Sequence, residues 1–163
     1  MKNIKITFAA LAAAVLLTGC TSDSTGSDNS SQDSVSVEQS ASVSERTASV
    51  LEAVELPEMV EVTAEKLAFY FSIEEGDVAE FSAYICGSGA MPDEFGVFVA
   101  ADEEKAAVVK TNLEERIEKQ KELFTDYTPA EMYKFDDCFV EVNGTTVIYG
   151  VTADNTTAKD MLG

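Results

Sequence analysis

Cysteines and carboxylates are the side chains with which this chain could do chemistry, because it contains no histidine. Without imidazole, Ser-His-Asp and Cys-His catalysis and histidine-ligated zinc are excluded. The three cysteines, Cys20, Cys86 and Cys138, lie too far apart in sequence to indicate a cysteine-rich metal site. We therefore expect no catalytic residue, no metal site and no cofactor in the folded part of the chain.

The 30 acidic residues allow two further chemistries. Two carboxylates in one cleft could hydrolyse glycosides, and several together could hold Ca²⁺. Acidic groups gather at 74–77, 93–94 and 136–137, but no Asp-x-Asp-x-Asp-Gly calcium loop is present. In a chain this acidic, solvated loops are the better interpretation, so a carboxylate-pair hydrolase is the weakest of our functional hypotheses.

A glycine-rich segment, Gly87-Ser88-Gly89, invites comparison with phosphate-binding loops. It lacks the Walker spacing and the lysine, and the third glycine of a dinucleotide-binding pattern would fall on Pro92. We interpret this segment as the turn between two strands.

The N-terminus has the order of a secretory signal peptide: a basic region with Lys2 and Lys5, an apolar run over 6–17, small residues and then a cysteine. Its ending resembles the lipobox of bacterial lipoproteins, which implies cleavage before the cysteine and a diacylglycerol on its sulfur. The lipobox residues are Leu17, Thr18, Gly19 and Cys20. The resemblance predicts attachment by acyl chains to the outer face of the bacterial cytoplasmic membrane.

The chain is expected to have three parts: a signal peptide over 1–19, a lipidated cysteine with a disordered tether over 20–45, and one globular domain over 46–163. The tether is rich in serine and aspartate and has too few apolar residues to fold. The full chain carries a net charge of −19, and loss of Lys2 and Lys5 with the leader takes it to −21. This charge is repelled by phosphates, so nucleic acid is excluded as a partner.

Apolar periodicity and turn signals predict the elements of the domain. Asp102 and Asp154 are expected to cap helices, Thr128 and Glu131 have the spacing of a capping box, and Asn143-Gly144 predicts a hairpin with a type I′ turn. The expected elements are helices over 45–56 and 64–71, strands over 78–86 and 94–101, a long helix over 103–126, a single turn over 129–133, strands over 138–142 and 145–152, and a helix over 155–162.

This α-α-β-β-α-β-β-α order predicts an α+β fold with a mainly antiparallel four-stranded sheet. The long helix is expected to pack on one face of the sheet, and the short helices to cover edges or ends. Its buried stripe is formed by Ala106, Val109, Leu113, Ile117, Gln120, Phe124 and Tyr127. Cys86 and Cys138 both fall in expected strands, where they could form a disulfide or serve as small buried residues.

Several stretches of the domain resemble a family of bacterial, mostly Firmicute, lipoproteins known as domain of unknown function 4358. The stretches are 70–73, 87–98 and 126–131, together with the hairpin around Asn143-Gly144. The resemblance spans about residues 47 to 160. It implies an exported, lipid-anchored domain, and it supplies no activity and no catalytic residue.

We therefore expect a non-enzymatic interaction module at the cell surface, held to the membrane by its lipid and contacting an unidentified envelope protein or small ligand. The alternative is a lipoprotein that binds cations or another ligand, such as a cationic peptide. Small and aromatic residues on loops suggest the contact surface. Its candidate residues are Gly87, Ser88, Gly89, Met91, Glu94, Phe95, Tyr127 and Tyr133.

Overall fold

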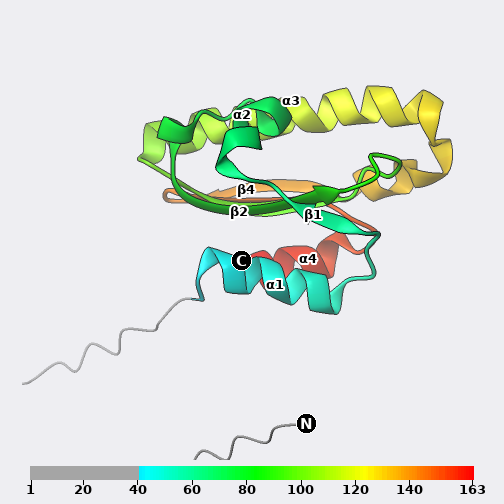
Figure 1. Ribbon diagram of the computed structural model, residues 1–163, viewed down its shortest axis with the longest axis horizontal. Helices are drawn as coiled ribbons and strands as arrows, with labels where there is room; N and C mark the ends of the chain where they lie inside the picture. The colour runs from blue at the N-terminus through cyan, green and yellow to red at the C-terminus, as the bar shows by residue number, and fades with distance from the viewer. Residues whose placement is uncertain (1–40) are drawn as a thin grey trace, which may run out of the picture. The chain divides into compact units, whose positions relative to one another are not determined.

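The computed structural model describes residues 41–163 (Figure 1). Their centre is one antiparallel sheet of five strands in the order β1-β2-β3-β5-β4. The strands are β1 (Met59–Glu61), β2 (Val78–Cys86), β3 (Glu94–Ala100), β4 (Phe139–Asn143) and β5 (Thr146–Val151). The helices are α1 (Val43–Ala53), α2 (Ala64–Phe71), α3 (Glu103–Tyr127) and α4 (Asn155–Leu162), with 3-10 helices η1 (Glu75–Asp77) and η2 (Pro129–Phe135).

The α+β class, the two hairpins and the long helix are confirmed, but the predicted number of four strands is wrong. The fifth strand is β1, which pairs with the end of β2 through Met59 and Cys86, Val60 and Ile85, and Glu61 and Tyr84. Sequence periodicity missed it because three residues are too few to display the alternation that identifies a strand.

Helices cover both faces of the sheet (Figure 1). α2 and α3 lie on one face, over a core that includes Phe71, Phe98 and Tyr149. α1 and α4 lie side by side on the other face, over Phe95 and Val97. The expectation that all the short helices cover edges or ends is therefore wrong. Helices are needed on both faces because β3 carries large apolar side chains toward both.

Helix α1 begins before the expected domain boundary at residue 46. Ser42 caps it, because the Ser42 hydroxyl accepts a hydrogen bond from the Glu45 amide and the Glu45 carboxylate accepts one from the Ser42 amide. In the middle of the helix, the Thr47 hydroxyl lies 2.7 Å from the Ser82 hydroxyl of β2, and both groups are buried. The folded unit thus includes residues assigned by composition to the tether.

Two of the predicted local motifs take a different form. The capping box after α3 does not form: the Thr128 side chain makes no cap bond, and the segment continues as a 3-10 helix to Phe135. In the last hairpin, Asn143 pairs with Thr146, so the turn residues are Gly144 and Thr145. Gly144 has φ of +59° while its neighbours do not enter the positive region, which fits a type II′ turn rather than the predicted type I′. The predicted caps Asp102 and Asp154 are confirmed.

Candidate functional site

The candidate site is built around the β2–β3 loop, Gly87–Asp93. The Cys86 amide closes it by donating to the Asp93 carbonyl at 2.8 Å. Gly89 turns the chain with φ of +65°, in the region that only glycine enters readily. Gly87 lies so close to β1 that a Cβ there would come within 2.7 Å of the Val60 side chain. Strand β1, although short, therefore holds one side of the loop.

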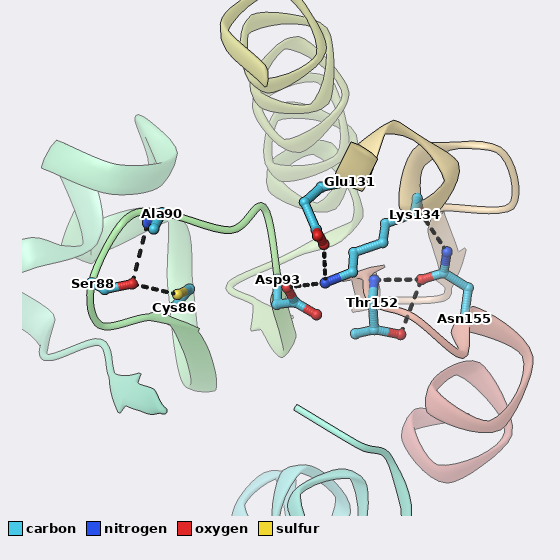
Figure 2. A network of polar contacts seen from close by, with 8 residues as sticks. All are labelled: Cys86, Ser88, Ala90, Asp93, Glu131, Lys134, Thr152 and Asn155. Carbon is cyan, nitrogen blue, oxygen red and sulfur yellow. Dashed lines mark hydrogen bonds and ion pairs between the residues drawn. The ribbon is translucent and has the colours of Figure 1, made fainter. Parts of the chain in front are cut away.

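The buried thiol of Cys86 lies under this loop. Its sulfur is 3.3 Å from the Ser88 hydroxyl, whose oxygen also accepts a hydrogen bond from the Ala90 amide at 3.2 Å (Figure 2). Burial by itself raises the pKa of Cys86, but the Ser88 hydroxyl and the backbone amides of the loop outweigh it, so the pKa lies below its ordinary value. The opposite holds for Cys138, whose pKa is raised by burial.

Glu94, the first residue of β3, anchors the loop to the face of the sheet that α3 covers. Its fully buried carboxylate accepts hydrogen bonds from Arg116 Nε at 2.8 and 2.9 Å, from Gln120 at 3.1 Å and from the Tyr149 hydroxyl. The guanidinium of Arg116 also donates to the Tyr70 carbonyl, where α2 ends. Burial raises the pKa of Glu94, and the positive charge of Arg116 opposes this. One carboxylate thus connects three elements of the domain.

Asp93 anchors the other end of the loop. Its buried carboxylate accepts a hydrogen bond from Lys134 of η2 at 2.6 Å, and Lys134 also pairs with Glu131 at 2.8 Å (Figure 2). Burial lowers the pKa of Lys134, but the two carboxylates outweigh it and hold the pKa above its ordinary value. Burial raises the pKa of Asp93, against the effect of Lys134. The second oxygen, Asp93 Oδ1, has no hydrogen-bond partner among residues 41–163.

A third set of contacts fixes the backbone at Lys134. The side-chain amide of Asn155 donates to the Lys134 carbonyl at 2.8 Å, while its oxygen accepts from the Thr152 amide at 2.8 Å (Figure 2). All three residues are buried. The 3-10 helix that supplies the partner of Asp93 is therefore tied to the end of β5 and the start of α4.

Two hollows lie beside the loop and share Met91, whose side chain is 40% exposed. The first has a volume of about 300 Å³, with Arg116 and Gln120 among its polar lining and Tyr70 and Leu123 among its apolar lining. The second has a volume of about 410 Å³ and lies between Pro57, Tyr133 and Lys134. Their combination of polar and apolar lining suits a peptide or a small amphipathic group.

The structure does not bring all eight candidate surface residues together on one exposed surface. The first hollow is lined by Gly87, Ser88, Gly89, Met91 and Glu94. Tyr133 lines the second hollow and Tyr127 is 63% exposed but lines neither. The prediction is wrong for Phe95, which is 0% exposed and lines neither hollow, and Glu94, at 1% exposed, contributes only to the inner wall of the first hollow. Both follow a turn, but they belong to a strand that is covered on both faces.

Sequence reasoning missed the cations that neutralise the two carboxylates, Arg116 and Lys134. Arg116 lies one residue before Ile117 on the predicted stripe and one helical turn before Gln120, and this position was the available signal. Lys134 follows Glu131 by three residues but lies just beyond the single turn predicted over 129–133, whereas the 3-10 helix continues to Phe135. The chain has only 11 basic residues against 30 acidic ones. A basic residue next to an apolar stripe therefore indicates a candidate partner for a buried carboxylate.

Several predictions concern chemistry elsewhere in the chain. Cys86 and Cys138 are both free thiols. Cys86 ends β2, whereas Cys138 comes immediately before β4 and not within it as predicted. The two strands are three strand spacings apart in the sheet, or about 14 Å, which is too far for a disulfide. Among residues 41–163, no three His, Cys, Asp or Glu side chains converge as metal ligands. Within the same range no helix is long and apolar enough to cross a membrane. The lipobox, Leu17 to Cys20, lies outside the described residues.

The fold and its buried ion pairs define a small α+β domain whose five-stranded antiparallel sheet is covered on both faces. Residues 52–152 match the family described as Domain of unknown function (DUF4358), and the chain belongs to this family. Neither a curated protein nor a solved structure matches the chain. The matched range includes the β2–β3 loop and the partners of Asp93 and Glu94.

Proposed function

We propose that this chain is a lipid-anchored extracytoplasmic protein whose folded domain is a non-enzymatic interaction module, with the β2–β3 loop as its contact surface. The observation that carries the proposal is the position of Met91, exposed between two hollows on a loop whose ends are anchored by buried ion pairs. A fixed loop loses little conformational entropy on binding, which favours recognition.

The arrangement of charges supports interaction rather than catalysis. A general acid or base must have a proton-transferring group within reach of a substrate. Glu94 and Asp93 are each buried and each bound to a cation, with side chains 2% and 0% exposed. These carboxylates hold the loop in position. The exposed part of the loop itself, residues 87–91, consists instead of small and apolar residues with backbone groups.

The lipid anchor is tested by labelling growing cells with an alkyne analogue of palmitate. We expect the full chain to carry the label and Cys20→Ala to lose it, because the lipobox cysteine is the expected acceptor. Cys86→Ala and Cys138→Ala serve as matched controls and should keep the label. A Cys20→Ala chain that is still labelled would contradict the anchor.

The contact surface is tested by placing a photo-crosslinking amino acid at Met91 in living cells. Val108 on α3 is the matched control, because both side chains are 40% exposed. We expect an adduct of defined mass from position 91 and none from position 108. Tyr133→Ala, in the adjoining hollow, should reduce the adduct. Equal adducts from both positions, or none from position 91, would exclude the loop as the contact surface.

A further inference from the structure

The edge of the sheet formed by β4 is distinct from the loop site and is open to pairing. β4 pairs only with β5, through Phe139 and Gly150, Glu141 and Ile148, and Asn143 and Thr146. Its other side faces no strand among residues 41–163. An unpaired strand edge presents backbone donors and acceptors in the spacing that another strand needs.

The register identifies the backbone groups that point outward. The Thr145 carbonyl accepts a hydrogen bond from the Ala100 amide, so the backbone groups of Thr145 point toward β3. Backbone direction alternates along a strand, so the amide and carbonyl groups of every second residue of β5, beginning at Thr146, point toward β4. Their partners in β4 are residues 139, 141 and 143. The amide and carbonyl groups of Val140 and Val142 therefore point away from the sheet. Val142 is also 41% exposed at its side chain.

The surface beside this edge is hollow along the whole strand. A hollow of about 700 Å³ lies between residues 136–141 and helix α4, and a second of about 210 Å³ continues along residues 141–143. Glu141 lines both, and we name the two adjoining hollows together the β4 groove. A strand added to β4 would lie beside this groove and could place alternate side chains in it.

The charge of the β4 groove selects the occupant. The larger hollow is lined by four carboxylates and one ammonium group, and that ammonium, Lys159, is bound to Glu141 at 2.5 Å. The smaller hollow adds one more cation, Arg46, whose guanidinium donates to the Gly163 carbonyl at 3.4 Å, so carboxylates still outnumber cations in the groove. The other three carboxylates, Asp136, Asp137 and Asp160, have no ion-pair partner among residues 41–163. An incoming strand with basic side chains would therefore be attracted to this edge.

The same charges disfavour two other occupants. In an antiparallel pairing of two β4 edges centred on Glu141, this residue would face Glu141 of the second copy, and like charges opposite each other destabilise a sheet. The segment of this chain over residues 21–40 contains acidic residues and no lysine or arginine. We propose that the β4 edge docks an extended, basic segment of a partner protein, which pairs with Val140 and Val142 as a sixth strand.

The test measures amide hydrogen exchange of the full chain in detergent micelles, with a blocked peptide of alternating lysine and valine as the probe. We expect exchange at Val140 and Val142 to slow about tenfold or more at saturating peptide. The outward amides of the opposite edge, at Met59 and Glu61 of β1, should be unaffected. A peptide with glutamate in place of lysine should give no protection. Protection confined to the β2–β3 loop, or equal protection by both peptides, would overturn the proposal.

Substitutions separate the backbone pairing from the charge. Val142→Pro removes an outward amide and leaves the bonds between β4 and β5 intact, so it should abolish binding. Glu61→Pro is its counterpart on β1 and should bind as the original chain does. Combined Asp136→Asn and Asp137→Asn retains the strand and should weaken binding about tenfold. If Val142→Pro does not fold, the double asparagine variant still tests the proposal. An unchanged affinity of that variant for the lysine–valine peptide would overturn it. Protection at Val142 that rises with protein concentration in the absence of peptide would instead indicate a second copy as the occupant.

Discussion

Asp93 and Glu94 are neighbours in sequence, and each is a buried carboxylate bound to a cation, yet their surroundings differ. Glu94 accepts hydrogen bonds from Arg116, Gln120 and Tyr149, which engage both of its oxygens. Asp93 receives one hydrogen bond from a side chain, that of Lys134, and its Oδ1 has no partner among residues 41–163. The difference arises because Glu94 begins β3, which α3 covers, whereas Asp93 is the last residue of the loop and lies beside η2. Glu94 faces the polar side chains of α3, whereas Asp93 faces a single lysine.

This comparison predicts that the Glu94 network contributes more to folding than the Asp93 pair. Removal of one partner of a buried ion pair leaves an uncompensated charge in the core. The cost depends on how readily the remaining group can become neutral and on how many other contacts the lost side chain made. Arg116 connects α3 with β3 and with the end of α2, whereas Lys134 connects only η2 with the loop.

The largest effect is expected from Arg116→Met. This variant leaves the Glu94 carboxylate without its cation and the Tyr70 carbonyl without its hydrogen bond from Arg116. We therefore expect a loss of about 3–5 kcal/mol in the free energy of unfolding. Urea denaturation followed by circular dichroism measures it. The double variant Arg116→Met with Glu94→Leu should recover most of the loss, since it leaves no unpaired charge. A single variant within about 1 kcal/mol of the original chain would show that the network is not structural.

A smaller loss, about 2–3 kcal/mol at neutral pH, is expected from Lys134→Met. Burial already raises the pKa of Asp93, and removal of the lysine raises it further. A carboxyl group whose pKa is higher in the folded than in the unfolded chain gives stability that is present at low pH and lost as pH rises. The deficit of Lys134→Met should therefore shrink as the pH falls from 7 toward 5, as measured by melting temperatures. A deficit that is constant over this range would contradict the assignment of the buried charge to Asp93.

The partly exposed pair Asp77–Lys105 provides the reference for both buried pairs. Hydrogen bonds from Lys105 and from the Glu74 amide lower the pKa of Asp77 below its ordinary value of 3.8. A lowered carboxyl pKa gives stability that is present above the unfolded value and is lost as pH falls through the folded value. We expect Asp77→Asn to reduce the melting temperature at pH 6 and to match the original chain near pH 2. A difference that persists at pH 2 would indicate a role for Asp77 that does not depend on its charge.

The elements of this fold were predictable where the sequence pattern is long or the turn chemistry is specific. Helix α3 is predicted by its stripe and by Asp102, and the last hairpin by Asn143-Gly144, although the type of its turn differs. Strand β1 and the second helix-covered face were not predictable, because a three-residue strand has no periodicity and a short amphipathic helix does not reveal what it covers. The position of the loop was predicted, but the burial of Glu94 and Phe95 depends on α3 and on the α1–α4 pair. The cations of the two buried pairs are distant in the sequence. Arg116 lies 22 residues from Glu94, and Lys134 lies 41 residues from Asp93.

The smallest expected change in stability comes from comparing two buried threonine hydroxyls, one with a hydrogen-bond partner and one without. The Thr128 hydroxyl, like Asp93 Oδ1, is buried and has no hydrogen-bond partner among residues 41–163, whereas the Thr47 hydroxyl bonds to Ser82 at 2.7 Å. Valine has nearly the shape of threonine and carries no hydroxyl. Thr128→Val should therefore stabilise the domain by up to about 1 kcal/mol, because it removes a desolvated polar group that gains nothing in return. Thr47→Val should destabilise it by about 1–2 kcal/mol, because Ser82 is left buried without its partner. Opposite shifts in the urea midpoint are the expected result, and shifts of the same sign would show that burial of the hydroxyl, rather than its bonding, sets the cost.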